Sequence, residues 1–133
     1  MKKIRIESQW NGNDEVMLNI PDFPHLHAAL NKNLEKYNRY PHPYEYFLSS
    51  LSGAITAFIK DFSNKHSLIT GNLYIIIEGI FNEDLSKIEK LILEIKYDSN
   101  ATGRQLTELQ HGLLNKELIL SLLKKEKIQI NWN

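Results

Sequence analysis

The side chains that could carry acid–base or metal chemistry are the five histidines and the carboxylates near them. His25 and His27 form a His-x-His pair, whose side chains point the same way if the backbone there is extended. A metal site needs three or four converging donors, and the sequence shows no recognisable third ligand beside this pair. We therefore expect no metal site and no cofactor, and we interpret both histidines as polar loop residues.

A second group of candidates surrounds the start of a predicted helix. His42 and Glu45 could do general acid–base work, but their spacing is common by chance. Glu45 is equally typical of a first helical turn, where the helix dipole stabilises a negative charge. Four tyrosines crowd the same segment and suit either an interface, the mouth of a ligand site, or ordinary packing. These are Tyr37, Tyr40, Tyr44 and Tyr46.

Composition removes several classes of function. The chain has no cysteine, so disulfides, thiolate metal sites and thiol nucleophiles are excluded. Lys plus Arg and Asp plus Glu both number 16, so the basic excess of a nucleic-acid binder is missing. Residues 1–5 do not begin a signal peptide, and no apolar run approaches the ~20 residues of a membrane span. We expect a cytoplasmic protein with neither a nucleic-acid nor a membrane partner.

The N-terminal part of the chain predicts a hairpin and then a long helix. Apolar residues alternate with polar ones on both sides of the turn signal at 11–14, which predicts a hairpin over residues 3–20. Residues 21–42 are ambiguous, although Leu26, Leu30 and Leu34 could line a short helix. From Pro43 to His66 the apolar residues recur at helical spacing, and Pro43 suits a first helical turn.

The C-terminal part predicts strands around a second helix. Leu73–Ile80 and Leu91–Tyr97 read as strands, joined by a charged connection that could form a short helix capped by Asn82. Leucines at helical spacing predict a helix from about Thr102 to Lys125, and Ile128–Trp132 reads as a last strand. The order indicates a single α+β domain over residues 1–133, with a long apolar helix lying on an antiparallel sheet.

The segment from Pro43 to Thr56 resembles the central helix of the OsmC/Ohr family of small peroxide-reducing proteins. It reads Pro-Tyr-Glu-Tyr-Phe-Leu-Ser-Ser-Leu-Ser-Gly-Ala-Ile-Thr. The peroxide-reacting cysteine of the family aligns with Ala54, and the resolving cysteine aligns best with Glu117. Glu45 matches a glutamate that in the family helps to hold an arginine near the reactive site. None of Arg5, Arg39 and Arg104 can be assigned as that arginine.

The resemblance implies an intertwined homodimer with a pocket at its interface, and the zero net charge also favours a buried interface. The leading hypothesis is non-catalytic binding of a small apolar ligand there, with Tyr44, Glu45, Ala54 and Glu117 as candidate binding residues. The first alternative is an enzyme of another class that uses Glu45, Glu117 and His42. The second is a structural or interaction protein with no small-molecule site. Ala54 itself could also simply pack in the core. Thiol peroxidase chemistry is not expected without a cysteine.

Overall fold

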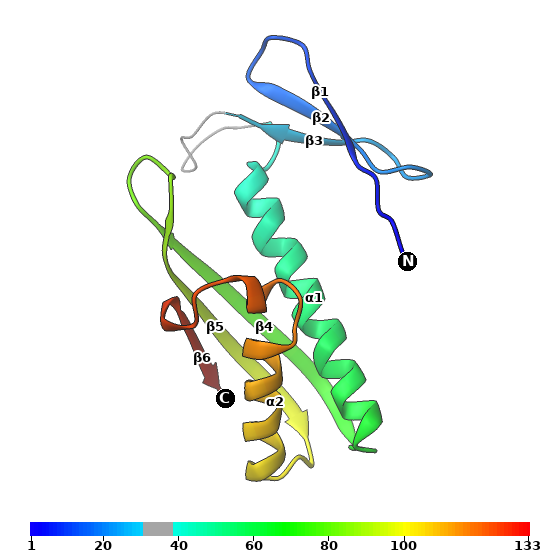
Figure 1. The fold of residues 1–133 in the computed structure, drawn as a ribbon, viewed down its shortest axis with the longest axis vertical. Helices are drawn as coiled ribbons and strands as arrows, with labels where there is room; N and C mark the ends of the chain where they lie inside the picture. The colour runs from blue at the N-terminus through cyan, green and yellow to red at the C-terminus, as the bar shows by residue number, and fades with distance from the viewer. Residues whose placement is uncertain (31–38) are drawn as a thin grey trace. The chain divides into compact units, whose positions relative to one another are not determined.

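A computed structural model describes residues 1–30 and 39–133 of the chain (Figure 1). The chain divides into two compact units, Met1–Phe47 and Leu48–Asn133. Each unit is described by itself below. The long helix α1, Pro43–Lys65, begins in the first unit and continues through the second.

The first unit contains a three-stranded antiparallel sheet in the order β1-β2-β3. Its strands are β1, Glu7–Trp10, β2, Glu15–Asn19, and β3, Leu26–Ala29. The predicted hairpin is confirmed, and Gly12 takes a positive φ of 88° in its turn. The strand begins at Glu7 rather than at residue 3, because the register opposes Glu7 to Asn19 and would soon reach Pro21, which has no N–H to donate.

The structure has a strand, and not the expected short helix, at the first of the three residues Leu26, Leu30 and Leu34. Leu26 lies in β3 and pairs with Leu18 of β2, whereas Leu34 lies outside the described residues. The chain reverses through a turn in which the N–H of Phe23 donates to the carbonyl of Ile20. The neighbouring Asp22 has a φ of 70°. This turn returns the chain beside β2, so pairing with β2 prevails over the helical spacing of the leucines.

The second unit is built on a three-stranded sheet in the order β4-β5-β6. Its strands are β4, Thr70–Phe81, β5, Ile88–Ser99, and β6, Ile128–Trp132. β4 and β5 are antiparallel, but β6 runs parallel to β5, so the expectation of a purely antiparallel sheet is wrong here. A parallel neighbour needs a long crossover, and the chain between β5 and β6 supplies one that contains helix α2, Gly103–Asn115.

The connection between β4 and β5 is a turn and not the predicted short helix. The side-chain oxygen of Asn82 accepts from the backbone N–H of Lys87 across the turn, at 3.0 Å. Leu85 has a φ of 57°, in the left-handed region that no right-handed helix can include. Asn82 therefore closes a turn instead of capping a helix.

The two helices begin as predicted, but the second ends early. α1 runs from Pro43 to Lys65, one residue short of the prediction. α2 begins after Thr102, which exchanges side-chain and backbone hydrogen bonds with Gln105 as a capping box. It ends at Asn115 and not near Lys125, and two short 3₁₀ turns follow: η1, Leu120–Leu122, and η2, Lys125–Lys127. No helix in the described part of the chain is long and apolar enough to span a membrane.

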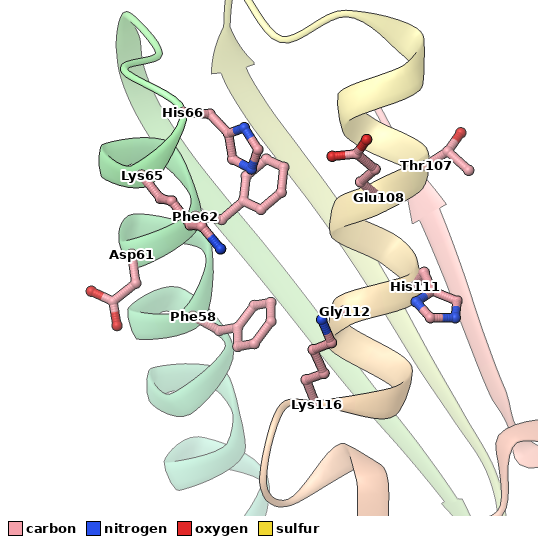
Figure 2. A pocket seen from close by; sticks show the side chains of 10 residues that line it. All are labelled: Phe58, Asp61, Phe62, Lys65, His66, Thr107, Glu108, His111, Gly112 and Lys116. Atoms are coloured by element: carbon pink, nitrogen blue, oxygen red, sulfur yellow. The ribbon is translucent and has the colours of Figure 1, made fainter.

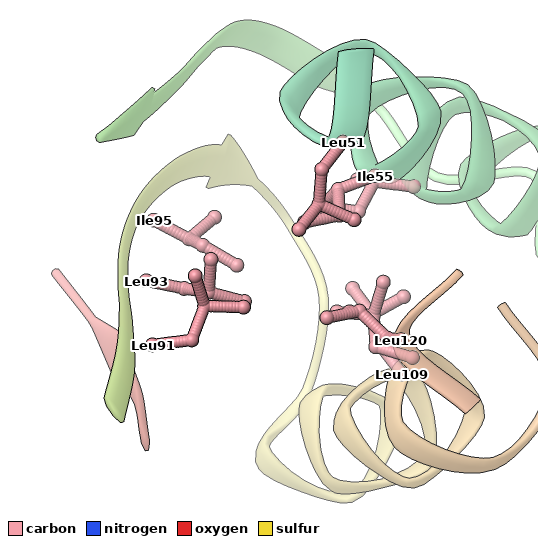
Figure 3. Packing of buried hydrophobic residues seen from close by; sticks show 9 residues of the cluster. Leu51, Ile55, Leu91, Leu93, Ile95, Leu109 and Leu120 are labelled. Carbon is pink, nitrogen blue, oxygen red and sulfur yellow. The ribbon is translucent and has the colours of Figure 1, made fainter. Parts of the chain in front are cut away.

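The core of the second unit lies between its sheet and both helices (Figures 1 and 3). The prediction placed only the long helix on the sheet, whereas α2 contributes to the same core. Each fully buried aliphatic side chain stabilises the fold by roughly 1.5–3 kcal/mol relative to an exposed one. The buried cluster comprises Leu51, Ile55, Ile59, Leu91, Leu93, Ile95, Leu109, Leu113 and Leu120.

Candidate functional site

His42 and Glu45 cap the start of α1. The backbone N–H of His42 donates to a carboxylate oxygen of Glu45 at 3.0 Å. In return, Nδ1 of His42 accepts from the backbone N–H of Tyr44 at 3.1 Å. This reciprocal arrangement satisfies backbone donors at the helix start in the manner of a capping box. The pair suggested for acid–base chemistry therefore has a structural role in the described structure.

The tyrosines near this cap are mostly engaged in packing within the first unit. Tyr40 stacks on the ring of His27, with centroids 4.8 Å apart, and the hydroxyl of Tyr46 donates to the carbonyl of His27 at 2.9 Å. Tyr44 meets the ring of His42 edge-on and leaves 38% of its surface exposed. Tyr37 lies outside the described residues. Among the described tyrosines of this group, Tyr44 has the most surface left for a partner or ligand.

The histidines considered as metal ligands lie in different surroundings. His25 is exposed, and His27 is stacked on Tyr40. Within residues 1–30 and 39–133, no three histidine or carboxylate side chains come together as metal donors would.

Ala54 lies at the border between two faces of α1. Leu51 and Ile55 on one side of the helix are buried in the core, whereas Gly53 and Ala57 on the other side are exposed. Ala54 itself is half-buried. A Cβ built on Gly53 would meet no atom of the described residues within 4 Å outside the neighbouring helix backbone, so nothing in the described part of the chain packs on α1 at this position. The methyl of Ala54 is therefore partly available to another molecule.

Glu117 is buried and holds the turn that follows α2. Only 4% of the residue is exposed. Its carboxylate accepts from the backbone N–H of Ile119 at 2.7 Å and from that of Leu120 at 3.1 Å. These bonds explain why α2 stops, because the side chain turns back to satisfy backbone donors of the next segment. Glu117 belongs to the second unit with Ala54, whereas Tyr44 and Glu45 belong to the first.

A groove that sequence reasoning missed separates α1 and α2 in the second unit (Figure 2). Its volume is about 740 Å³, within the range of small-molecule sites. Phe58 and Phe62, one turn apart on α1, present aromatic rings to it, and Gly112 faces them from α2. The signal in the sequence was the i, i+4 spacing of Phe58, Phe62 and His66. The groove is lined by Phe58, Asp61, Phe62, Lys65, His66, Thr107, Glu108, His111, Gly112 and Lys116.

Gly112 determines how closely the two helices approach at this groove. A Cβ added there would lie 3.1 Å from the ring of Phe58, closer than ordinary van der Waals contact. Because glycine has no side chain, α2 approaches the ring without covering the rest of it. The groove contains none of Tyr44, Glu45, Ala54 and Glu117.

Comparison with known proteins identifies the fold by structure and not by sequence. No protein-family model and no curated protein matches the chain. Among solved structures, an OsmC-like protein of unknown function from Vibrio cholerae matches with a TM-score of 0.80 at 12% identity, over 100% of both chains. An OsmC-like protein from Mycoplasma pneumoniae matches with a TM-score of 0.77 at 14% identity, over 99% of this chain and 95% of that one.

A protein named for organic hydroperoxide resistance has the same architecture. OhrB of Bacillus subtilis matches with a TM-score of 0.69 at 6% identity, over 99% of this chain and 98% of that one. Identities this low establish the fold alone. The chain therefore has the OsmC/Ohr-like fold, and it has this fold without a single cysteine.

Proposed function

We propose that this protein is a non-catalytic binding protein that holds a small, largely apolar ligand beside Ala54, at the interface of a homodimer. The observation that carries the proposal is the face of α1 next to Ala54. It is exposed in the described part of the chain and contains small uncharged residues over several turns. They are Ser49, Ser50, Gly53, Thr56 and Ala57.

A second copy of the chain is the partner that best fits this face. Small residues let two helix backbones approach closely, and a glycine inside an exposed helix otherwise costs about 0.5–1 kcal/mol relative to alanine. β4 adds a second reason, because it is an edge strand whose outward face carries the exposed apolar residues Tyr74, Ile76 and Ile80. Exposed apolar surface on an edge strand favours association. We expect an interface of roughly 2,000 Å² or more in total.

The absence of a nucleophile supports binding rather than catalysis. Thiolate attack on a peroxide requires a cysteine, and the chain contains none. The carboxylates of Glu45 and Glu117 accept hydrogen bonds from backbone N–H groups, and His42 accepts from Tyr44. An enzyme built on these three groups would have to break helix and turn caps in order to use them.

The ligand class follows from the surroundings of Ala54. The resemblance aligns the reactive cysteine of the OsmC/Ohr family with Ala54. A methyl group therefore stands where the family has a reactive sulfur. Nearby exposed residues on α1 are small and uncharged, which provides room but no charge for recognition. Ala54 does not line the groove between α1 and α2, and we propose that a second copy completes the ligand site beside it.

Binding of an uncharged fluorophore, N-phenyl-1-naphthylamine, tests the proposal. We expect saturable binding to the wild-type protein, loss of that binding in Ala54→Phe, and retention in the conservative variant Ala54→Cys. Ala54→Phe should cost about 1–3 kcal/mol of stability through overpacking, so circular dichroism must first show that it is folded. Equal binding by the folded Phe variant and the wild type would place the ligand elsewhere and contradict the proposal.

A parallel assay tests the non-catalytic part. Wild-type protein mixed with tert-butyl hydroperoxide and a dithiol should consume peroxide at the blank rate, because no sulfur nucleophile is present. A protein-dependent rate that scales with protein concentration would contradict it.

A further inference from the structure

We propose that the groove between α1 and α2 binds a small amphipathic anion. Its flat apolar body would lie on Phe58 and Phe62, and its carboxylate would lie between Lys65 and Lys116. This site is separate from the one proposed beside Ala54, since the two share no residue. The ligand class is an aromatic or similarly flat monocarboxylate.

The floor of the groove is aromatic and firmly held. Phe58 and Phe62 pack against the buried core cluster on one side and line the groove on the other. His66 lies against Phe62 with ring centroids 4.2 Å apart and an interplanar angle of 39°. Because Gly112 contributes no side chain opposite Phe58, the aromatic surface stays accessible between the helices (Figure 2). A planar apolar group would gain both burial and aromatic contact there.

The charges around this floor favour an anion. Figure 2 shows the ammonium groups of Lys65, from α1, and Lys116, beyond the end of α2, pointing into the space between the helices. In the described part of the chain, neither lysine has a carboxylate within ion-pair distance. Two ammonium groups on opposite walls can hold one carboxylate by charge-assisted hydrogen bonds.

The acidic residues of the groove do not reverse this preference. Glu108 forms an exposed ion pair with Arg104, at 3.7 Å, so part of its charge is balanced by that guanidinium. Asp61 points away from α2 on the outer side of α1 (Figure 2). A cationic ligand would therefore meet two lysines without an ion-pair partner and one carboxylate that is shared with Arg104. A purely apolar ligand would gain nothing from the two ammonium groups.

Titration of the full-length protein with 2-naphthoate tests the inference, and ¹H–¹⁵N chemical-shift changes locate the binding. We expect saturable shifts at residues of the groove, weaker binding in high salt, and much weaker binding of the neutral analogue 2-naphthylmethanol. Lys65→Gln and Lys116→Gln should each weaken 2-naphthoate binding about threefold to fivefold, the scale of one exposed charge pair. Lys60→Gln is the matched control, since Lys60 is also exposed on α1 but does not line the groove.

Three results would overturn the inference. The first is no saturable binding at millimolar 2-naphthoate, as expected if a second copy of the chain fills the groove. The second is equal binding of the carboxylate and the neutral alcohol. The third is equal weakening by Lys60→Gln and by the two groove variants. All three lysines are exposed, so the substitutions should leave the fold intact, and the Ala54 experiment reports separately on the other site.

Discussion

The two units of the chain bury their apolar side chains to very different extents. In the second unit, nine aliphatic residues form one cluster with at most 1% of each exposed. In the described part of the first unit, the only buried apolar residues are Ala28 and Ala29. Large apolar side chains there face solvent, including Ile4 at 89%, Trp10 at 63% and Phe23 at 66% exposed.

This difference indicates which unit is stabilised by a hydrophobic core of its own. The second unit has a sheet covered by two helices, and hydrophobic burial there can offset the entropy of folding. In the first unit, all four residues of β1 are exposed, so this sheet has little core of its own. The exposed aromatic and aliphatic residues of this unit are therefore surface that favours association.

Core truncation should show the largest contrast between the units. Ile55→Ala removes a fully buried side chain from the cluster and should lower the free energy of unfolding by about 2–5 kcal/mol. Ile4→Ala removes a largely exposed side chain and should change it by about 0.5 kcal/mol or less. Urea melts of both variants give the comparison. A large loss from Ile4→Ala would contradict this contrast between the two units.

Removal of the buried cap after α2 should have an intermediate effect. Glu117→Ala leaves the N–H groups of Ile119 and Leu120 without their carboxylate and should cost about 1–3 kcal/mol. Glu126→Ala, at an exposed position, is the matched control and should be nearly neutral. Thermal melts followed by circular dichroism measure both. An unaffected melting temperature in Glu117→Ala would show that the turn does not depend on its carboxylate.

Gly53→Ala should have the smallest effect on the free energy of unfolding, but the sign of that effect distinguishes an exposed helix face from a packed one. If Gly53 faces water in the native assembly, Gly53→Ala should stabilise the protein by about 0.5–1 kcal/mol, because alanine favours the helix. If a second helix backbone packs there, the added methyl should destabilise it instead. We expect destabilisation that depends on protein concentration, measured by melts at two concentrations. Asn64→Ala, exposed on the same helix, is the control.

Helices and strands that are determined by neighbouring residues could be predicted from the sequence. The bounds of α1 followed from Pro43 and from a regular apolar spacing, and both long strands followed from dense isoleucine and leucine. Local signals could not give the direction of β6, because that depends on where the crossover returns the chain. They also placed the end of α2 too late, since Leu118 and Leu122 continue the helical spacing although both are exposed, at 75% and 78%. The buried side chain of Glu117 decides that boundary.

The candidate site was predictable only in part. The sequence singled out His42 and Glu45 but left open whether they do chemistry or cap a helix, and their hydrogen bonds favour the cap. The groove was not predicted, because it needs Gly112 to face Phe58 across two helices that are distant in sequence. The single domain over residues 1–133 and the homodimer stay predictions.

The mass of the protein in solution tests the central claim most directly. One chain has a mass of 15.5 kDa, and sedimentation equilibrium at micromolar concentration should give twice this value for the wild type. Gly53→Leu places a large side chain on the open face of α1 and should shift the mass toward that of one chain while the core of the second unit stays folded. A wild-type mass of one chain, or a Gly53→Leu variant that associates as tightly as the wild type, would contradict an interface on this face of α1.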